Sequence, residues 1–236
     1  MIPRLFWPSL TTAIMLAMTT GLGVWQVERL RWKTELLHEI DQGEAAPAHQ
    51  LPASPQSPMP PPFTKVRVSG LLRQDLQALY GVDVRDTLTG PVMGAYLVEP
   101  LERPGADPVI VNRGWVPTDR IQPGSPVDAT VEGYVRAPER PGLFSLSDDP
   151  VARRFYSLDP AAIAASFGLS HAAPFTLVSL GSVPPGVYPE PATAMPRPPN
   201  NHLTYAITWF SLSVILVVIF TIFVRQNLSA RVKEPA

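Results

Sequence analysis

Two long stretches of uncharged residues constrain this chain most. The first runs for 23 residues from Leu5 to Val27, and the second runs for 22 residues from Leu203 to Val224. Each is long enough for a helix to cross the roughly 30 Å of hydrocarbon in a lipid bilayer. We therefore expect transmembrane helices at residues 5–27 and 203–224, with the lipid bilayer as the partner of both.

The first stretch has an alternative interpretation as a cleaved signal peptide, because it follows a single basic residue, Arg4, near the start of the sequence. Its apolar run exceeds the roughly 7–15 residues of a signal-peptide core. No cleavage site of the A-x-A type follows it. These two features favour an uncleaved membrane anchor.

The ionisable residues are distributed unevenly. The chain has a formal net charge of −1, but residues 34–200 hold 12 Lys and Arg against 18 Asp and Glu, and the two ends hold 7 against 2. The acidic central region argues against binding to nucleic acid. Near the spans, four basic residues lie on the terminal side and four on the loop side, so the positive-inside rule leaves the orientation open.

The region between the spans changes composition several times. Residues 28–41 are expected to extend the first helix. A linker at residues 42–62 contains seven prolines, and such a composition predicts an extended, solvated segment. A β domain is expected at residues 63–183, and a second Pro-rich tether at residues 184–199 leads back to the second span. Residues 225–236 form a short tail.

The central domain shows short runs of alternating apolar and polar residues between Gly and Pro turns, which is typical of strands. The expected strands are Phe63–Val68, Gln77–Val82, Met93–Val98, Val109–Val116, Thr130–Val135, Arg154–Leu158 and Phe175–Leu180. One helix is expected at Pro160–Phe167, with Asp159 as its N-cap and Gly168 just past its end. The predicted fold class is an α+β membrane protein, in which two transmembrane helices flank a mainly antiparallel β barrel or sandwich with one or two short helices.

Several kinds of chemistry lack their usual residues. The chain contains no cysteine, which excludes disulfides, Cys-ligated metal clusters and covalently attached haem. No G-x-S-x-G, H-E-x-x-H, S-x-x-K or nucleotide-binding glycine motif is present. The acidic pair Asp148-Asp149 lies in a Ser-Asp-Asp-Pro turn, where Asp favours backbone hydrogen bonds. We therefore expect a protein that is not an enzyme. A membrane-anchored enzyme stays as an alternative that a β-domain pocket lined by convergent titratable groups would revive.

Aromatic and basic residues gather where the first span ends. Trp25, Arg29 and Trp32 are spaced i, i+4 and i+7, which places them on one stripe of a continuous helix. One interpretation is that they are anchors at the headgroup boundary, where Trp and Arg are common. The other is that they form part of a binding site.

The second span opens with Asn200-Asn201-His202, and either Asn is a candidate helix cap. His202, Ala206 and Trp209 share a stripe, with Tyr205 beside it. His202 is either a polar residue at the interface or a ligand for haem iron, since His is the side chain that can ligate haem in a chain without Cys. In the second case Arg29 is a candidate partner for the haem propionates.

Four blocks resemble the Surfeit locus protein one family, the assembly factors of haem-copper cytochrome oxidase. They are Gly23–Lys33, similar to the family's G-x-W-Q-x-x-R-x-x-W-K, Phe63–Gly70, similar to its opening strand, Val109–Pro117, similar to its V-N-R-G-W-V-P, and Pro199–Phe210, similar to its P-x-N-H-x-x-Y-A-x-T-W-F. The blocks occur in the family's order.

No Arg- and Ser-rich presequence precedes the first span, which favours a bacterial inner membrane over a mitochondrial one. The resemblance implies that the two spans place the termini and tail in the cytoplasm and the central domain in the periplasm. It implies transient binding of haem a, with His202 as the iron ligand, and help in its insertion into the largest subunit of the oxidase. Haem a synthase is a further candidate partner. The residues expected around the haem are His202, Trp25, Arg29, Trp32, Tyr205 and Trp209. The alternative is a haem-free scaffold that stabilises a subunit of a cytochrome c or quinol oxidase during assembly.

The block Asn112-Arg113-Gly114-Trp115 places an arginine in an otherwise apolar strand. We expect Arg113 to hold the domain together by bonding loop carbonyls, and Gly114 to permit a close backbone approach. The alternative is that this block contacts the oxidase.

Overall fold

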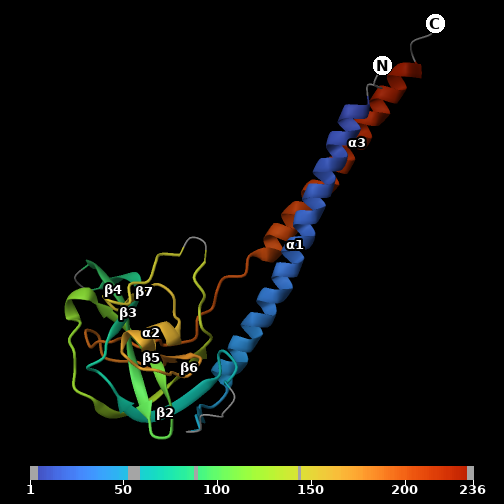
Figure 1. Ribbon diagram of the computed structural model, residues 1–236. Helices are drawn as coiled ribbons and strands as arrows, with labels where there is room; N and C mark the ends of the chain where they lie inside the picture. The colour runs from blue at the N-terminus through green and yellow to red at the C-terminus, as the bar shows by residue number, and fades with distance from the viewer. Residues whose placement is uncertain (1–4, 53–58, 88–89, 143–144, 233–236) are drawn as a thin grey trace. The chain divides into compact units, whose positions relative to one another are not determined.

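The computed structural model of the protein describes residues 5–52, 59–87, 90–142 and 145–232 (Figure 1). Its elements, in chain order, are α1 (Phe6–Ala45), β1 (His49–Gln50), β2 (Lys65–Leu72), β3 (Ala78–Thr87), β4 (Gly90–Arg103), β5 (Ala106–Pro117), the short 3-10 helix η1 (Thr118–Arg120), β6 (Val127–Arg136), β7 (Arg154–Phe155), α2 (Pro160–Ser166), β8 (Thr176–Ser179) and α3 (His202–Val232). They form two compact units, one with α3 and most of α1, the other spanning Glu39–Pro196 and holding the sheet.

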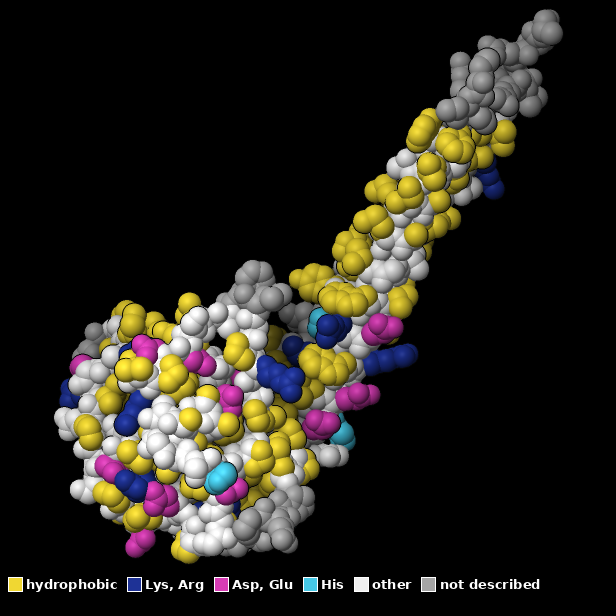
Figure 2. Space-filling model, viewed as in Figure 1, with side chains coloured by type: hydrophobic (Ala, Val, Ile, Leu, Met, Phe, Trp, Pro, Cys, Tyr) yellow, Lys and Arg dark blue, Asp and Glu magenta, His cyan; other side chains and the backbone are white. Residues whose placement is uncertain are grey.

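The two terminal helices are each long and apolar enough to cross a membrane. Figure 2 shows apolar side chains over much of their visible surface. The expectation of apolar helices at both ends of a β domain is therefore confirmed, and the pair is compatible with a two-pass membrane protein.

Helix α1 continues without a break through the expected span and the expected extension. Its 40 residues correspond to about 60 Å of helix, well beyond the thickness of a bilayer's hydrocarbon. Pro8 lies in the first turn, where backbone N–H groups have no acceptor within the helix, so its missing N–H is tolerated. Helix α3 starts at His202 and continues past the expected span to Val232.

Small and hydroxyl-bearing residues join the two helices. Ser213 Oγ donates a hydrogen bond to Thr19 Oγ1 at 2.8 Å, and both residues are buried. At Gly23, a Cβ atom would come within 2.8 Å of the Phe210 ring, so a larger residue would require this ring to move. Contacts of this kind, between small and hydroxyl-bearing residues, are typical of helix pairs in lipid.

The second unit is built on a closed five-stranded barrel. The strands pair in the order β2-β6-β8-β5-β4, and β4 pairs again with β2 at Leu72 and Leu101, which closes the ring. Strands β3 and β7 continue the sheet beyond β4, and β1 lies on β2. Of the two predicted architectures, the barrel is the one observed.

The prediction of a mainly antiparallel sheet needs a correction, because the sheet is mixed. Three of the eight pairings among the described residues are parallel, namely β1 with β2, β3 with β7 and β5 with β8. Strand β8 lies between β6 and β5 after a connection of about 40 residues that includes α2. A connection of this length allows the chain to return parallel to β5.

The barrel encloses an apolar core, and α2 covers a second one. The first includes Leu72, Val111 and Leu177, and the second includes Phe155 and Ile163, all fully buried or nearly so. As expected, Asp159 caps α2 by accepting a hydrogen bond from the Ala161 N–H at 2.9 Å.

The linker is not solvated throughout, contrary to our expectation. Its first residues belong to α1, β1 pairs with β2, and Leu51 is 8% exposed within the barrel's core. Leu51 is the one leucine in this Pro-rich segment, and burying it brings the neighbouring backbone onto the sheet edge. Residues 53–58 lie outside the described part of the chain.

The second Pro-rich tether also packs on the barrel, which corrects its description as a simple lead to the membrane. Glu190 and Trp115 exchange two backbone hydrogen bonds, each 2.8 Å long. Ala192 bridges to Leu180, and Met195 is 3% exposed. The tether therefore acts as an additional irregular strand of the β domain.

Candidate functional site

The predicted stripe on α1 forms a stack in which the Arg29 guanidinium lies between two tryptophan rings. The guanidinium carbon of Arg29 lies 5.7 Å from the centroid of the Trp25 ring and 5.5 Å from that of Trp32. Both rings are about half exposed, at 45% for Trp25 and 52% for Trp32. In the described part of the chain Arg29 has no carboxylate partner, so its charge is balanced by no acidic group there.

His202, the first residue of α3, is held by a buried amide from α1. Its Nδ1 lies 2.7 Å from Oε1 of Gln26, which is 8% exposed. Because a carbonyl oxygen can only accept, Nδ1 carries the proton in this pair, and the lone pair of the neutral ring is on Nε2. Nε2 has no hydrogen-bond partner among the described residues.

Trp25 joins the imidazole to the arginine stack. The Trp25 and His202 rings meet edge to face, with centroids 6.4 Å apart and planes at 89°. The structure thus brings four of the predicted residues into one connected cluster on the helix pair. Together with Gln26, these residues (Trp25, Arg29, Trp32 and His202) form the helix-pair cluster.

Two further predicted residues lie outside these contacts. Tyr205 is 55% exposed, and its ring touches no other aromatic ring of the described chain. Trp209 is half-buried, and its backbone carbonyl accepts a hydrogen bond from Ser213 Oγ at 3.1 Å. Between them, Ala206 is 3% exposed and marks the side of α3 that is covered.

Among the described residues, neither asparagine before α3 caps the helix with its side chain, which was one expectation from the sequence. The carbonyl of Asn201 accepts the first helical hydrogen bond, from the Tyr205 N–H at 3.4 Å. The amide of Asn200 donates instead to Thr34 Oγ1 at 3.5 Å. This bond adds another polar link between the two helices.

Sequence reasoning did not single out Gln26, although it lies within the first family-like block. Its position next to Trp25 turns it away from the exposed stripe and onto the buried face of α1. A polar residue on the covered face of an apolar helix is a signal in itself, because it must find a partner there. The identity of that partner depends on the register between the helices, which the sequence does not contain.

Arg113 has the structural role that we expected, but with a different partner. Its Nη1 lies 2.9 Å from Oε2 of Glu99, which is 1% exposed, and no loop carbonyl of the described residues accepts from it. Gln77 donates to the other carboxylate oxygen at 3.0 Å. Burial raises the pKa of Glu99 above its ordinary value, against the opposing effects of Arg113 and Gln77. Arg113 therefore compensates a buried carboxylate inside the barrel wall.

Gly114 permits a close backbone approach, as predicted. It adopts a φ of 122°, and a Cβ atom on it would overlap the carbonyl oxygen of Glu190. Asn112 supports this turn of the strand, because its Oδ1 accepts a hydrogen bond from the Gly114 N–H at 3.0 Å. The block thus fixes the tether onto β5.

The acidic pair at 148 and 149 is structural, as expected. Asp149 Oδ1 accepts from the N–H groups of Val151 and Ala152. Asp148 accepts from the N–H groups of Tyr156 and Ser157. Because the N–H groups of Tyr156 and Ser157 donate to Asp148, they are not available for pairing with another strand. Strand β7 therefore ends at Phe155 and not at Leu158.

The chain combines two apolar terminal helices, a five-stranded barrel between them, and a polar and aromatic cluster on the helix pair. The sequence model of the SURF1 family matches residues 13–214, which include almost the whole of this arrangement. The chain therefore belongs to the SURF1 family.

Individual relatives agree with this assignment. The chain is 28% identical over 237 residues to a SURF1-like protein of Monosiga brevicollis, covering 94% of this chain and 88% of the relative. It is 29% identical to Surfeit locus protein 1 of Homo sapiens, over 82% of this chain and 69% of the relative. It is 26% identical to a SURF1-like protein of Rickettsia felis, over 94% and 98% of the two chains.

Proposed function

We propose that this protein is an assembly factor of haem-copper oxidase, which binds haem a at the helix-pair cluster, at the edge of the membrane, and aids its insertion into the largest oxidase subunit. The protein spans the bacterial inner membrane twice, with its termini and the tail 225–236 in the cytoplasm and the β domain in the periplasm. Membership of the SURF1 family supports this proposal, and so do the two apolar helices.

The observation that carries the proposal is the state of the His202 side chain. Its imidazole is oriented by one hydrogen bond from Nδ1 to Gln26, which leaves Nε2 as the atom that can bind iron. This is the usual arrangement for a metal-ligating histidine, in which the second nitrogen donates to an oxygen acceptor. In this role haem a is cargo, held in transit and not used for chemistry.

The neighbours of His202 suit an amphipathic macrocycle. Trp25 and Trp32 offer exposed apolar ring surface, and Tyr205 and Trp209 lie further along α3 as expected contacts. Arg29 is a cation without an acidic partner among the described residues and can pair with a propionate. Each kind of group that haem a requires is therefore represented near the imidazole.

The direct test measures the oxidase. In cells from which this chain is deleted, the ratio of haem a to the largest oxidase subunit should fall several-fold, and expression of the wild-type chain should restore it. An unchanged ratio in the deleted cells would contradict the proposal.

A haem-free scaffold is the second candidate, because the chain has a β domain of its own besides the helix pair. A scaffold would co-purify with an oxidase subunit equally well from cells that cannot make haem a. The proposed haem carrier should instead co-purify with the subunit much less from those cells than from cells that make haem a.

Replacing Gln26 by leucine should weaken binding of haem a to the purified full chain by about 10- to 100-fold, which is the usual range for removing a partner of a metal ligand. The leucine keeps most of the buried volume but leaves His202 Nδ1 without an acceptor. Gln26→Glu retains an acceptor oxygen and is the matched control, with affinity at least equal to that of the wild type. Haem titration monitored by absorbance gives both affinities, and equal weakening by the two variants would contradict a positioning role.

A further inference from the structure

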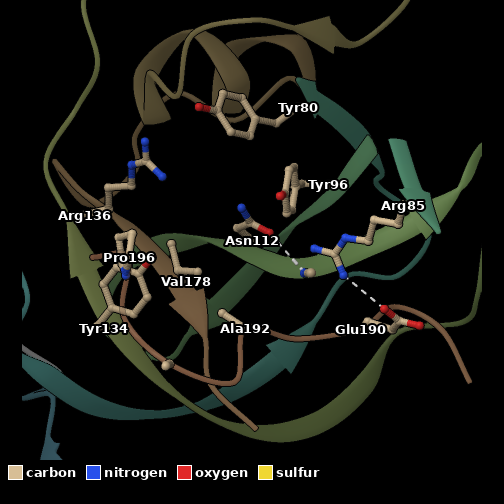
Figure 3. A pocket seen from close by; sticks show the side chains of 12 residues that line it. Tyr80, Arg85, Tyr96, Asn112, Tyr134, Arg136, Val178, Glu190, Ala192 and Pro196 are labelled. Atoms are coloured by element: carbon tan, nitrogen blue, oxygen red, sulfur yellow. Dashed lines mark hydrogen bonds and ion pairs between the residues drawn. The ribbon is translucent and has the colours of Figure 1, made fainter. Parts of the chain in front are cut away.

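The β domain contains a cavity that the proposed haem carrier does not use. Its volume is about 340 Å³, near the lower limit for small-molecule sites. Strands β3, β4, β5, β6 and β8 and the tether contribute to its wall (Figure 3). The polar and aromatic side chains that line it are Tyr80, Arg85, Tyr96, Asn112, Tyr134, Arg136 and Glu190.

Both positive charges of the cavity are already balanced by carboxylates. Arg85 pairs with Asp83 at 3.1 Å and with Glu190 at 3.0 Å, and Arg136 pairs with Glu139. Two guanidinium groups therefore face three carboxylates, and no positive charge is left over to attract an anion. An uncharged ligand fits this balance better than a carboxylate or a phosphate.

A hydrogen-bond donor remains available at the centre of the cavity. Asn112 is 4% exposed, and its Oδ1 is occupied by the Gly114 N–H. Figure 3 shows its amide nitrogen turned into the open space. Among the described residues Nδ2 has no hydrogen-bond partner. Nδ2 faces the cavity, so a carbonyl oxygen of an uncharged ligand can accept a hydrogen bond from it.

Aromatic rings supply part of the remaining surface, beside aliphatic residues such as Val178 and Pro196. The Tyr80 and Tyr96 rings have centroids 6.1 Å apart, and their hydroxyls are engaged with Glu139 and Asp83. The hydroxyls are thus fixed at the wall, which leaves ring surface to contact a ligand. A flat ring is the shape that such surfaces accommodate best.

The cavity does contain convergent titratable groups, but they are unsuited to catalysis. Burial raises the pKa of Tyr80 to about 12 and also raises that of Tyr134, so both phenols stay protonated at neutral pH. The two arginines are paired, and the residues that line the cavity include no His, Ser, Cys or Lys. These features favour binding over a hydrolytic or nucleophilic reaction.

We propose that this cavity binds a small, uncharged, flat ring compound that carries a carbonyl oxygen, with Asn112 Nδ2 donating to that oxygen and the tyrosine rings flanking the ring. The proposal is independent of haem, because every residue of the cavity belongs to the β domain.

The test is a calorimetric titration of the full chain in lipid nanodiscs with benzamide. Benzamide should bind at one site per chain and more tightly than benzoate, which adds a charge, or cyclohexanecarboxamide, which lacks the flat ring. Asn112→Asp keeps an oxygen for the Gly114 N–H but removes the donor, and it should weaken binding at least about tenfold. Asn227→Asp is the matched control on α3 and should bind benzamide like the wild type.

A second variant keeps the test decisive where Asn112→Asp is poorly folded. Ala194 lines the cavity from an exposed position on the tether, so Ala194→Phe should fill the space with little effect on the fold and abolish the binding of benzamide. The proposal is overturned when the wild type binds no benzamide up to its solubility limit, when benzoate binds more tightly, or when Ala194→Phe binds like the wild type.

Discussion

Replacing His202 by alanine should weaken the binding of haem a to the purified chain by more than about 100-fold. The loss should exceed that of a variant in the supporting residue Gln26, because the bond to iron itself is removed and not only its orientation. The remaining contacts of Trp25 and Arg29 supply apolar surface and charge but no iron ligand. Titration of the full chain in detergent with haem a, followed by absorbance, gives the two affinities.

The control for this variant is another histidine of the same chain. His171 is exposed in the β domain, so His171→Ala should bind haem a with wild-type affinity. In cells, His202→Ala should also lower the haem a content of the oxidase, whereas His171→Ala should not. Wild-type affinity in the His202→Ala chain would exclude this residue as the ligand.

Replacing Gly114 by alanine should lower the free energy of unfolding by about 4 kcal/mol. A φ of 122° strains any residue with a Cβ, at a cost of about 1–3 kcal/mol. The new Cβ would also overlap the Glu190 carbonyl and push the tether away from β5. The two hydrogen bonds between Trp115 and Glu190 would then be lost, at about 1 kcal/mol each.

Gly105→Ala separates these two contributions. Gly105 also has a positive φ, at 75°, but no atom lies within 4 Å of the place where its Cβ would be. This variant should lose only about 1 kcal/mol from backbone strain. Urea unfolding of both variants in detergent, followed by near-ultraviolet circular dichroism, gives the comparison. Equal losses would mean that the packing of the tether contributes nothing.

Much of the fold follows from local patterns in the sequence. The two apolar stretches predict the terminal helices, since no other soluble or membrane element needs more than twenty uncharged residues in a row. Each of the seven expected strands overlaps an observed one, because alternating residues with Gly and Pro between them specify half-buried strands. The cap at Asp159 likewise depends only on its neighbours.

The errors concern segments whose structure depends on distant partners. Proline-rich composition predicts solvated chain, yet Leu51 and Met195 are buried on the barrel and carry their segments with them. The prediction of a mainly antiparallel sheet failed for a similar reason. The direction of β8 is determined by the route of the long connection before it, which local patterns do not specify. The partner of Arg113 is also distant in sequence, since Glu99 lies on the neighbouring strand.

In the candidate sites too, contacts within one element follow from the sequence, and contacts between elements do not. The stack of Trp25, Arg29 and Trp32 follows from helical spacing within one element. The contact of His202 with Gln26 requires the register of two helices whose contacting residues lie 176 positions apart along the chain. The β-domain cavity draws its side chains from five strands, so no local motif indicates it.

The proposed role of His202 is to hold haem a at the membrane edge. Its most direct test is the absorption spectrum of the full chain purified from cells that make haem a, recorded beside that of His202→Ala from the same cells. The proposal predicts haem a bands in the wild-type spectrum and their loss in the variant. Bands of equal strength in both proteins, or none in the wild type, would contradict it.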